Sequence, residues 1–253
     1  MHLEEFAEGH SLWHRMDPRV KILGVLSMAI VTAVSDKASA LLFALGFAVC
    51  ALVIARLDTR QVIIRMGVIN GFVLFLWFFL PFTTQGEVMA QLGGLDVSRE
   101  GIILALTITV KANAIAGITI ALLGTSTIFD LVHGLVHLRV PQRIVQLFFF
   151  TYRYISVIHR EYLSLRASMR LRCFKPRTDF HTYRSIAYLV GMLFVRSLDR
   201  SERIYQAMVL RGFSGTFWTL DHFHMRRSDW AALAMMVILV AAQIVLQVSG
   251  GIS

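Results

Sequence analysis

Hydrophobic residues in this chain are grouped in long runs that contain few charged side chains. A helix that crosses a bilayer needs about 20 apolar residues, and about 17–25 are tolerated. Five runs fit or approach this length: 20–34, 38–55, 66–80, 102–123 and 230–248. The first and third need flanking residues to complete a span, and Pro81 is expected to end the third. The pattern predicts an all-α, polytopic membrane helical bundle.

Residues 124–227 have a different pattern, in which apolar positions follow a helical period among many arginines. Three helices are predicted there, over 126–138, 141–171 and 183–210. Pro141 suits a helix start, and Pro176 disfavours a helical conformation in the residue before it. Gly212 and Gly215 supply the stop after the last helix. The segment therefore predicts one short helix followed by two long ones.

Two stretches of this segment, 140–158 and 183–195, are apolar enough to suggest further spans. The first contains Arg143 and Arg153, and arginines also flank the second. A charged residue at the bilayer centre costs about 2.5–3.5 kcal/mol on insertion scales. We therefore expect amphipathic helices that pack along the membrane face and under the bundle, with two more spans as the alternative.

Composition and charge orient the predicted spans. Of the 253 residues 56% are hydrophobic and only 16% are charged, whereas soluble proteins carry about 25% charged residues. The net charge is +9, and residues 124–227 hold 16 Lys/Arg against six Asp/Glu. The positive-inside rule then places the N-terminus and 124–227 in the cytoplasm and the C-terminus outside. Membrane topology is enough to explain the excess of Lys and Arg, and no nucleic-acid surface is predicted.

The predicted organisation has three parts. Residues 1–123 form an N-terminal membrane bundle of four spans, 124–227 a cytoplasmic region with long helices, and 228–253 a C-terminal membrane span. The first 17 residues lack the charged-then-apolar order of a cleaved signal peptide, so the first span is expected to remain as an anchor.

A short basic motif occurs twice in the cytoplasmic region. The stretch 168–174 reads Ser-Met-Arg-Leu-Arg-Cys-Phe, and 207–213 reads Ala-Met-Val-Leu-Arg-Gly-Phe. The two arginines, Arg172 and Arg211, are 39 residues apart, each at the predicted end of a long helix. Capping by a cation explains one such arginine, because the helix dipole favours it by about 0.3–1 kcal/mol. Two copies that share Met, Leu, Arg and Phe instead indicate a repeated interface, where arginine can pair with carboxylates or carbonyls.

A second motif precedes the first span. Asp17 is a suitable N-cap, Pro18 a suitable first helical residue, and Arg19 and Lys21 are expected at the cytoplasmic headgroups. We refer to these four residues as the N-terminal motif. A well-capped and well-oriented first span would be sufficient to explain it.

Lys111 and Asn113 interrupt the fourth span. An ionisable residue within a span indicates a functional site by default. The alternatives are a pairing across the bundle, for example with Thr107 or Thr109, or a side chain that extends to the membrane surface.

No catalytic or metal site is predicted. His133 and His137 share a helix face but lack a third ligand, and Cys50 and Cys173 show neither zinc spacing nor a reason to pair. The sequence has no Walker motif, so ATP would be used only by a partner.

These residues resemble the transmembrane (T) component of energy-coupling factor (ECF) transporters, above all its cobalt/nickel-type CbiQ branch. The resemblance covers nearly the whole chain and rests on His14 with the N-terminal motif, on the two arginine motifs, and on Tyr152-Arg153-Tyr154. The family's motifs are usually Ala-Arg-Gly or similar. Here they read Leu171-Arg172-Cys173 and Leu210-Arg211-Gly212.

The resemblance implies a multi-pass subunit of a bacterial inner membrane that binds no cofactor. Two cytoplasmic ATP-binding-cassette ATPases would each receive one motif, and long coupling helices over roughly 126–215 would carry ATPase closure to a separate substrate-binding membrane subunit. Cobalt is the first expected substrate and nickel the second, with a vitamin-type system as an alternative. A self-contained carrier or membrane enzyme is the competing class. The sequence shows neither the paired broken spans of a carrier nor the convergent acids of an enzyme.

Overall fold

The computed structural model describes residues 11–14, 16–84, 87–92, 95–138, 140–215 and 227–249. These residues form two compact units. The first unit contains the helices up to residue 138 together with the last helix, and the second contains two long helices.

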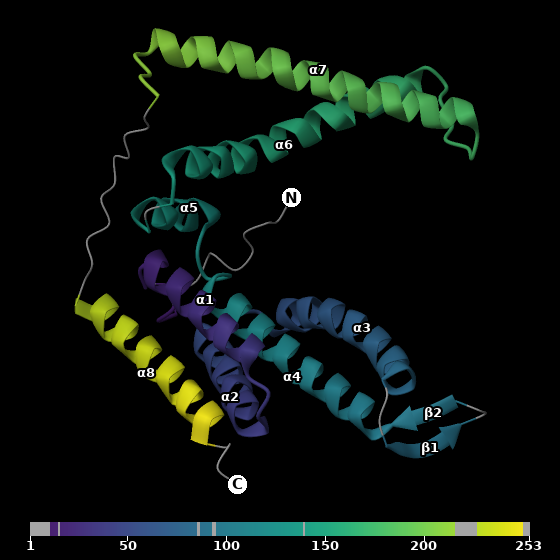
Figure 1. The fold of residues 1–253 in the computed structure, drawn as a ribbon. Helices are drawn as coiled ribbons and strands as arrows, with labels where there is room; N and C mark the ends of the chain where they lie inside the picture. Colours follow the sequence, from purple (N-terminus) through teal and green to yellow (C-terminus); the bar gives the residue numbers. More distant parts are fainter. Residues whose placement is uncertain are drawn as a thin grey trace. The chain divides into compact units, whose positions relative to one another are not determined.

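The first unit is a helical bundle with one short hairpin (Figure 1). Its helices are α1 (Pro18–Val34), α2 (Ala38–Ala55), α3 (Thr59–Thr83), α4 (Arg99–Leu122), α5 (Ile128–His137) and α8 (Arg227–Ser249). Helices α2, α3, α4 and α8 are long and apolar enough to cross a membrane. Helix α1 has 17 residues and packs against α4, α5 and α8. The predicted membrane bundle is therefore confirmed as a fold class.

Small residues allow the central helices to approach closely. A stripe on α2, comprising Ala40, Ala44, Ala48, Ala51 and Ala55, is buried. It faces α4, where a Cβ added at Gly117 would lie 3.0 Å from the Cβ of Ala48. Membrane helices associate through such small residues, because lipid provides no hydrophobic driving force between helices. The chemistry of the core is thus that of a membrane bundle.

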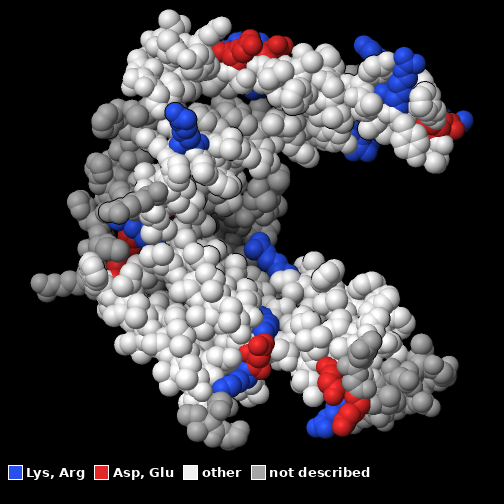
Figure 2. Space-filling model, in the orientation of Figure 1, with Lys and Arg blue, Asp and Glu red and all other residues white. Residues whose placement is uncertain are grey.

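The outside of this unit is apolar. Most of the large hydrophobic side chains of α3 are exposed, including Phe72, Phe75 and Phe78. Figure 2 shows few charged side chains on the visible face of this unit. A surface of this kind fits a lipid environment, in which the backbone bonds are made within the helix and the side chains face hydrocarbon.

The prediction that Pro81 ends the third span is wrong. Helix α3 continues to Thr83, with Pro81 in its last turn. The hydroxyl of Thr83 donates to the carbonyl of Phe79, and the backbone N–H of Thr84 donates to Leu80. Membrane helices tolerate proline where hydroxyl side chains and neighbouring segments satisfy freed backbone groups. A hairpin that the sequence pattern did not predict follows, formed by β1 (Val88–Leu92) and β2 (Leu95–Ser98).

The polar residues of α4 pair within the bundle. The Lys111 ammonium donates to Asp36 Oδ1 at 2.9 Å and to the carbonyl of Ala33 at 3.0 Å. Asn113 exchanges amide hydrogen bonds with Asn70 of α3. The alternative of a pairing across the bundle is therefore confirmed for Lys111, but its partners are Asp36 and Ala33 instead of Thr107 or Thr109. These contacts provide a structural explanation for both residues.

The second unit consists of α6 (Gln142–Leu171) and α7 (Phe180–Leu210). Helix α6 matches its prediction closely, with Pro141 as its N-cap residue. Helix α7 ends at the predicted residue but begins three residues before the predicted Tyr183. Asp179 occupies its N-cap position, where its backbone carbonyl accepts from the N–H groups of Thr182 and Tyr183.

Candidate functional site

The first arginine motif forms the end of α6. Arg172 is the C-cap residue, and Cys173 follows in the left-handed conformation with φ 61°. The N–H of Cys173 donates to Arg170 at 3.0 Å, and the N–H of Phe174 donates to Met169 at 3.1 Å. These two bonds define a Schellman motif, which satisfies carbonyls that a helix end otherwise leaves without a partner.

The second motif repeats this geometry at the end of α7. Arg211 is the C-cap residue, and Gly212 follows with φ 83°. The N–H of Gly212 donates to Val209 and the N–H of Phe213 donates to Met208, both at 3.0 Å. The two copies are therefore equivalent in backbone structure as well as in sequence.

The Met and Phe that the two motifs share have a local explanation that was not predicted from the sequence. They occupy the two positions of a Schellman motif between which a hydrophobic contact is common. All four side chains, Met169, Phe174, Met208 and Phe213, are partly buried. The spacing of Met and Phe around a small residue was the signal for this helix stop. Helix termination thus accounts for Met, the small residue and Phe in each copy.

Helix termination does not account for the leucines and arginines. Leu171 is 87% exposed and Leu210 is 88% exposed, although each is followed by two residues whose backbone N–H groups are hydrogen-bonded. Arg172 and Arg211 are exposed too, and within the described part of the chain neither forms an ion pair. A projecting apolar side chain beside a projecting guanidinium is suited to a groove with an acidic or carbonyl-rich wall.

The two motifs lie at opposite ends of the second unit. Helices α6 and α7 run in opposite directions in Figure 1, and Gln146, near the start of α6, contacts the carbonyl of Gly215, beyond the end of α7. Helices of 30 and 31 residues are each about 45 Å long. The two exposed Leu-Arg pairs are therefore separated by roughly one helix length, far enough to engage two different subunits.

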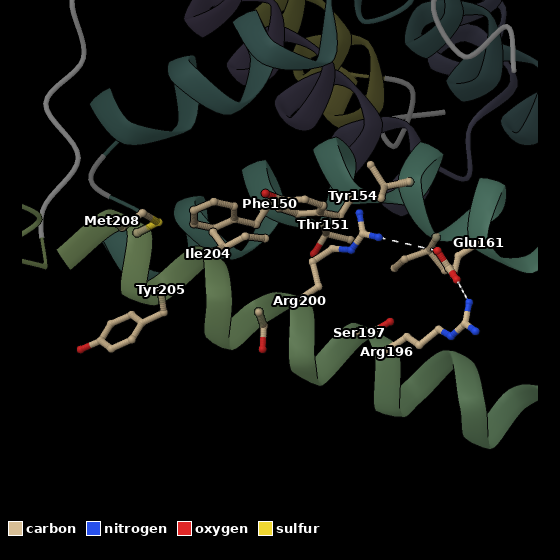
Figure 3. Close-up of a pocket in the computed structure, with 13 residues that line it drawn as sticks. Phe150, Thr151, Tyr154, Glu161, Arg196, Ser197, Arg200, Ile204, Tyr205 and Met208 are labelled. Atoms are coloured by element: carbon tan, nitrogen blue, oxygen red, sulfur yellow. Dashed lines mark hydrogen bonds and ion pairs between the residues drawn. The ribbon is translucent and has the colours of Figure 1, made fainter. Parts of the chain in front are cut away.

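A groove lies between the two helices (Figure 3). It has a volume of about 410 Å³ and is lined mainly by apolar side chains, among them Phe150, Tyr154, Ile204 and Met208. At one end Glu161 of α6 forms ion pairs with Arg196 and with Arg200 of α7. The carboxylate thereby joins the two helices where they pack together.

Cys173 offers a direct test of the helix-end geometry. A left-handed conformation costs a non-glycine residue about 1–2 kcal/mol. Glycine avoids this cost but loses more backbone entropy on folding, which reduces the gain in stability. We expect Cys173→Gly to stabilise the chain by about 0.5–1 kcal/mol, measured by thermal unfolding in detergent. Gly212→Cys is the matched change in the other copy and should lower stability, although a Cβ added at Gly212 would have no atom within 4 Å. The same sign for both variants would contradict this account.

The N-terminal motif belongs to the first unit. Asp17 caps α1 as predicted, its carboxylate accepting from the N–H of Arg19 at 2.8 Å, and Pro18 is the first helical residue. The headgroup location expected for Lys21 is wrong, because this side chain is only 1% exposed. It lies inside the bundle, where its ammonium has hydrogen-bond acceptors that the linear sequence did not indicate.

The remaining candidates show no chemical site. Cys50 and Cys173 are free thiols. Among the described residues no group of three His, Cys, Asp or Glu side chains could hold a metal ion. The side chain of His137, one of the two histidines considered for metal binding, lies outside what the structure describes.

Four helices long and apolar enough to cross a membrane, followed or preceded in the chain by a pair of long helices, define a multi-pass membrane protein. The sequence matches the cobalt transport protein family, CbiQ, over residues 9–221. The cobalt transport protein CbiQ of Rhodobacter capsulatus is 27% identical over 56% of this chain and 59% of that protein. The energy-coupling factor transporter transmembrane protein EcfT of Streptococcus equi subsp. equi is 24% identical over 94% of this chain and 93% of that protein. An uncharacterized protein of Methanocaldococcus jannaschii is 21% identical over 94% and 84%.

The chain belongs to the CbiQ family of cobalt transport proteins, the transmembrane components of ECF transporters. The resemblance drawn from the two arginine motifs and the N-terminal motif is confirmed at the level of the family. The protein is a multi-pass membrane protein and a transporter component rather than an enzyme.

Proposed function

We propose that this chain couples two cytoplasmic ATP-binding-cassette ATPases to a substrate-binding membrane subunit in an importer for cobalt, or else nickel. The observation that carries the proposal is the pair of equivalent helix ends, each projecting an exposed leucine and an exposed arginine. Two equivalent ends, about one helix length apart, suit two ATPase subunits that present equivalent grooves. Leu171, Arg172 and Cys173 would engage one groove, and Leu210, Arg211 and Gly212 the other.

The groove between α6 and α7 is our candidate for contact with the substrate-binding subunit. Its walls are apolar, as the surface of a membrane-embedded partner is, and it lies between the two helices that carry the motifs. A change in the crossing of α6 and α7, driven at the motifs, would change its shape. ATP would bind only to the ATPases, and the metal only to the membrane partner.

For the topology we propose the arrangement that the charge distribution predicts. Residues 1–123 would form the N-terminal membrane bundle, 124–227 the cytoplasmic coupling region and 228–253 the C-terminal span, with the N-terminus in the cytoplasm. A vitamin-type ECF importer is the second candidate function. The observation in its favour is that several relatives similar over most of this chain are named EcfT rather than CbiQ.

Affinity purification of this chain from its native membrane in mild detergent, with mass spectrometry, tests the proposal. We expect an ATP-binding-cassette ATPase and a small membrane protein to accompany it, and the identity of the second distinguishes metal from vitamin transport. Recovery of the folded chain alone would contradict the proposal and favour a self-contained carrier or enzyme.

The purified chain by itself is expected to hydrolyse no ATP, because its sequence contains no phosphate-binding loop. The measurement is phosphate release by the chain in detergent or liposomes, with the reconstituted complex as the positive control. Turnover that follows the pure chain through successive purification steps would exclude the role of a coupling subunit.

A further inference from the structure

Lys21 lies at a junction of three segments that are distant in the sequence. Its Nζ donates to the carbonyl of Thr125 at 3.4 Å, to Thr125 Oγ1 at 3.3 Å and to the hydroxyl of Ser126. These acceptors occupy the three donors that an ammonium group has. A buried cation is costly unless it is paired or fully hydrogen-bonded, so this arrangement holds the loop between α4 and α5 against α1.

The same junction includes the beginning of α8. Asp17 and Asp229 are both buried, and the backbone N–H of Asp17 donates to Asp229 Oδ1 at 3.2 Å. Asp17 also caps α1 through the N–H of Arg19. The N-terminal motif thus connects the start of α1 to α8 through Asp17 and to the α4–α5 loop through Lys21.

Helix α5 docks on α1 directly beside this junction. Thr127 caps α5 by accepting from the N–H of Asp130 at 3.1 Å. A Cβ added at Gly134 would lie 3.4 Å from Pro18 Cβ and 3.4 Å from Ile22 Cδ1, so the glycine permits close contact between the two helices. Isolated helices shorter than about 12–15 residues are marginal in water. With ten residues, α5 therefore depends on this docking.

Helix α5 is also the last element of the bundle before α6. Only residues 138–141 separate the two helices along the chain. On the N-terminal side of α6, α5 is therefore the first element of the bundle to which a force on α6 is transmitted along the chain. If α5 were free to slide on α1, a movement of α6 would only displace α5 and would not be transmitted to the rest of the bundle.

We infer that Lys21 is a positioning residue for energy coupling: it clamps the α4–α5 loop, and with it α5, to the start of α1, so that α5 is a fixed base for α6. This rests on the proposed function above. The N-terminal motif is then a mechanical anchor in addition to being the start of a span.

The first test is Lys21→Met, which keeps a long side chain but removes the ammonium. Uptake should fall about tenfold, which is the order expected for a residue that affects coupling without contacting either partner, while ATPase association and ATP hydrolysis by the complex persist. Lys37→Met, at the start of α2 beyond the other end of α1, is the matched control and should leave uptake unchanged. Uptake by Lys21→Met equal to that of the parent would overturn the inference.

The second test locks the docking covalently. Pro18→Cys with Gly134→Cys places two Cβ atoms about 3.4 Å apart, close to the 3.5–4.5 Å of disulfides. The oxidised double variant should retain uptake and should restore uptake to Lys21→Met, whereas the single-cysteine variants should not restore it. Loss of uptake on oxidation that reductant reverses would overturn the inference, as would a formed disulfide that fails to rescue Lys21→Met.

These outcomes are separable from failure of the proposed function. If the unmutated chain brings down no ATPase, the coupling role itself fails. If the unmutated complex transports and only the Lys21 results contradict expectation, the anchor alone is wrong. Should Lys21→Met not insert, the disulfide in the unmutated background still decides between a fixed and a moving α5.

Discussion

Replacing both Arg172 and Arg211 by alanine is expected to abolish uptake while leaving the chain inserted in the membrane. Both side chains are exposed, and the helix ends are held by backbone hydrogen bonds that the substitution retains. A hydrogen bond to a charged group contributes about 1.5–3 kcal/mol, so loss of two should weaken ATPase association at least about 100-fold. Uptake in cells and co-purification of the ATPase are the measurements. Each single variant should retain partial activity, because the other helix end remains intact.

The matched control removes the same charge from the same helices. Arg166 and Arg203 are exposed residues of α6 and α7 outside both motifs. Arg166→Ala with Arg203→Ala lowers the net charge equally but leaves both motifs in place, so uptake should persist. Full transport by the Arg172 and Arg211 double variant would refute the proposed interface. An equal loss of uptake in both double variants would show that the effect comes from the lower net charge and not from the two motifs.

Replacing Leu171 and Leu210 by serine is expected to release the ATPases without destabilising the chain. Both side chains are almost fully exposed, so their removal leaves no cavity in the subunit itself. Burying a leucine in a partner's groove contributes about 1.5–3 kcal/mol, which corresponds to about 10- to 100-fold in affinity for each end. The measurement is ATPase retention on the purified chain as the concentration is lowered.

Leu198→Ser is the control for this second prediction. Leu198 is an exposed leucine in the middle of α7, away from either motif. Its substitution should leave ATPase retention unchanged. Retention by the Leu171 and Leu210 double variant equal to that of the control would show that the projecting leucines do not contribute to binding.

The helix ends show how far local sequence rules extend. The stops after Leu171 and Leu210 depend on a residue in the left-handed conformation and on backbone hydrogen bonds that span at most five positions, and both are encoded within seven residues. For this reason the two long helices and the equivalence of the two motifs could be predicted. Asp17 and Pro18 could be predicted likewise, because capping involves only neighbouring residues.

The errors occur where partners are remote in sequence. Lys21 was predicted at the headgroups because it is a cation at the start of the first span, yet its acceptors are more than 100 positions away. For Lys111 a pairing across the bundle was one alternative, but its partner, Asp36 after α1, could not be identified from the sequence. Pro81 was expected to stop a helix, but it lies in a last turn where threonine hydroxyls bond to nearby carbonyls.

A helical membrane protein with two equal, cationic helix ends can be predicted from this sequence, because hydropathy, charge bias and helix termination are local properties. Which polar residues are buried together, and which apolar residues stay exposed, depends instead on tertiary contacts. The burial of a lysine depends on acceptors that other helices bring to it, and the exposure of a leucine depends on no helix covering it. Those two facts, at Lys21 and at Leu171 with Leu210, underlie the anchor and the interface proposed for this subunit.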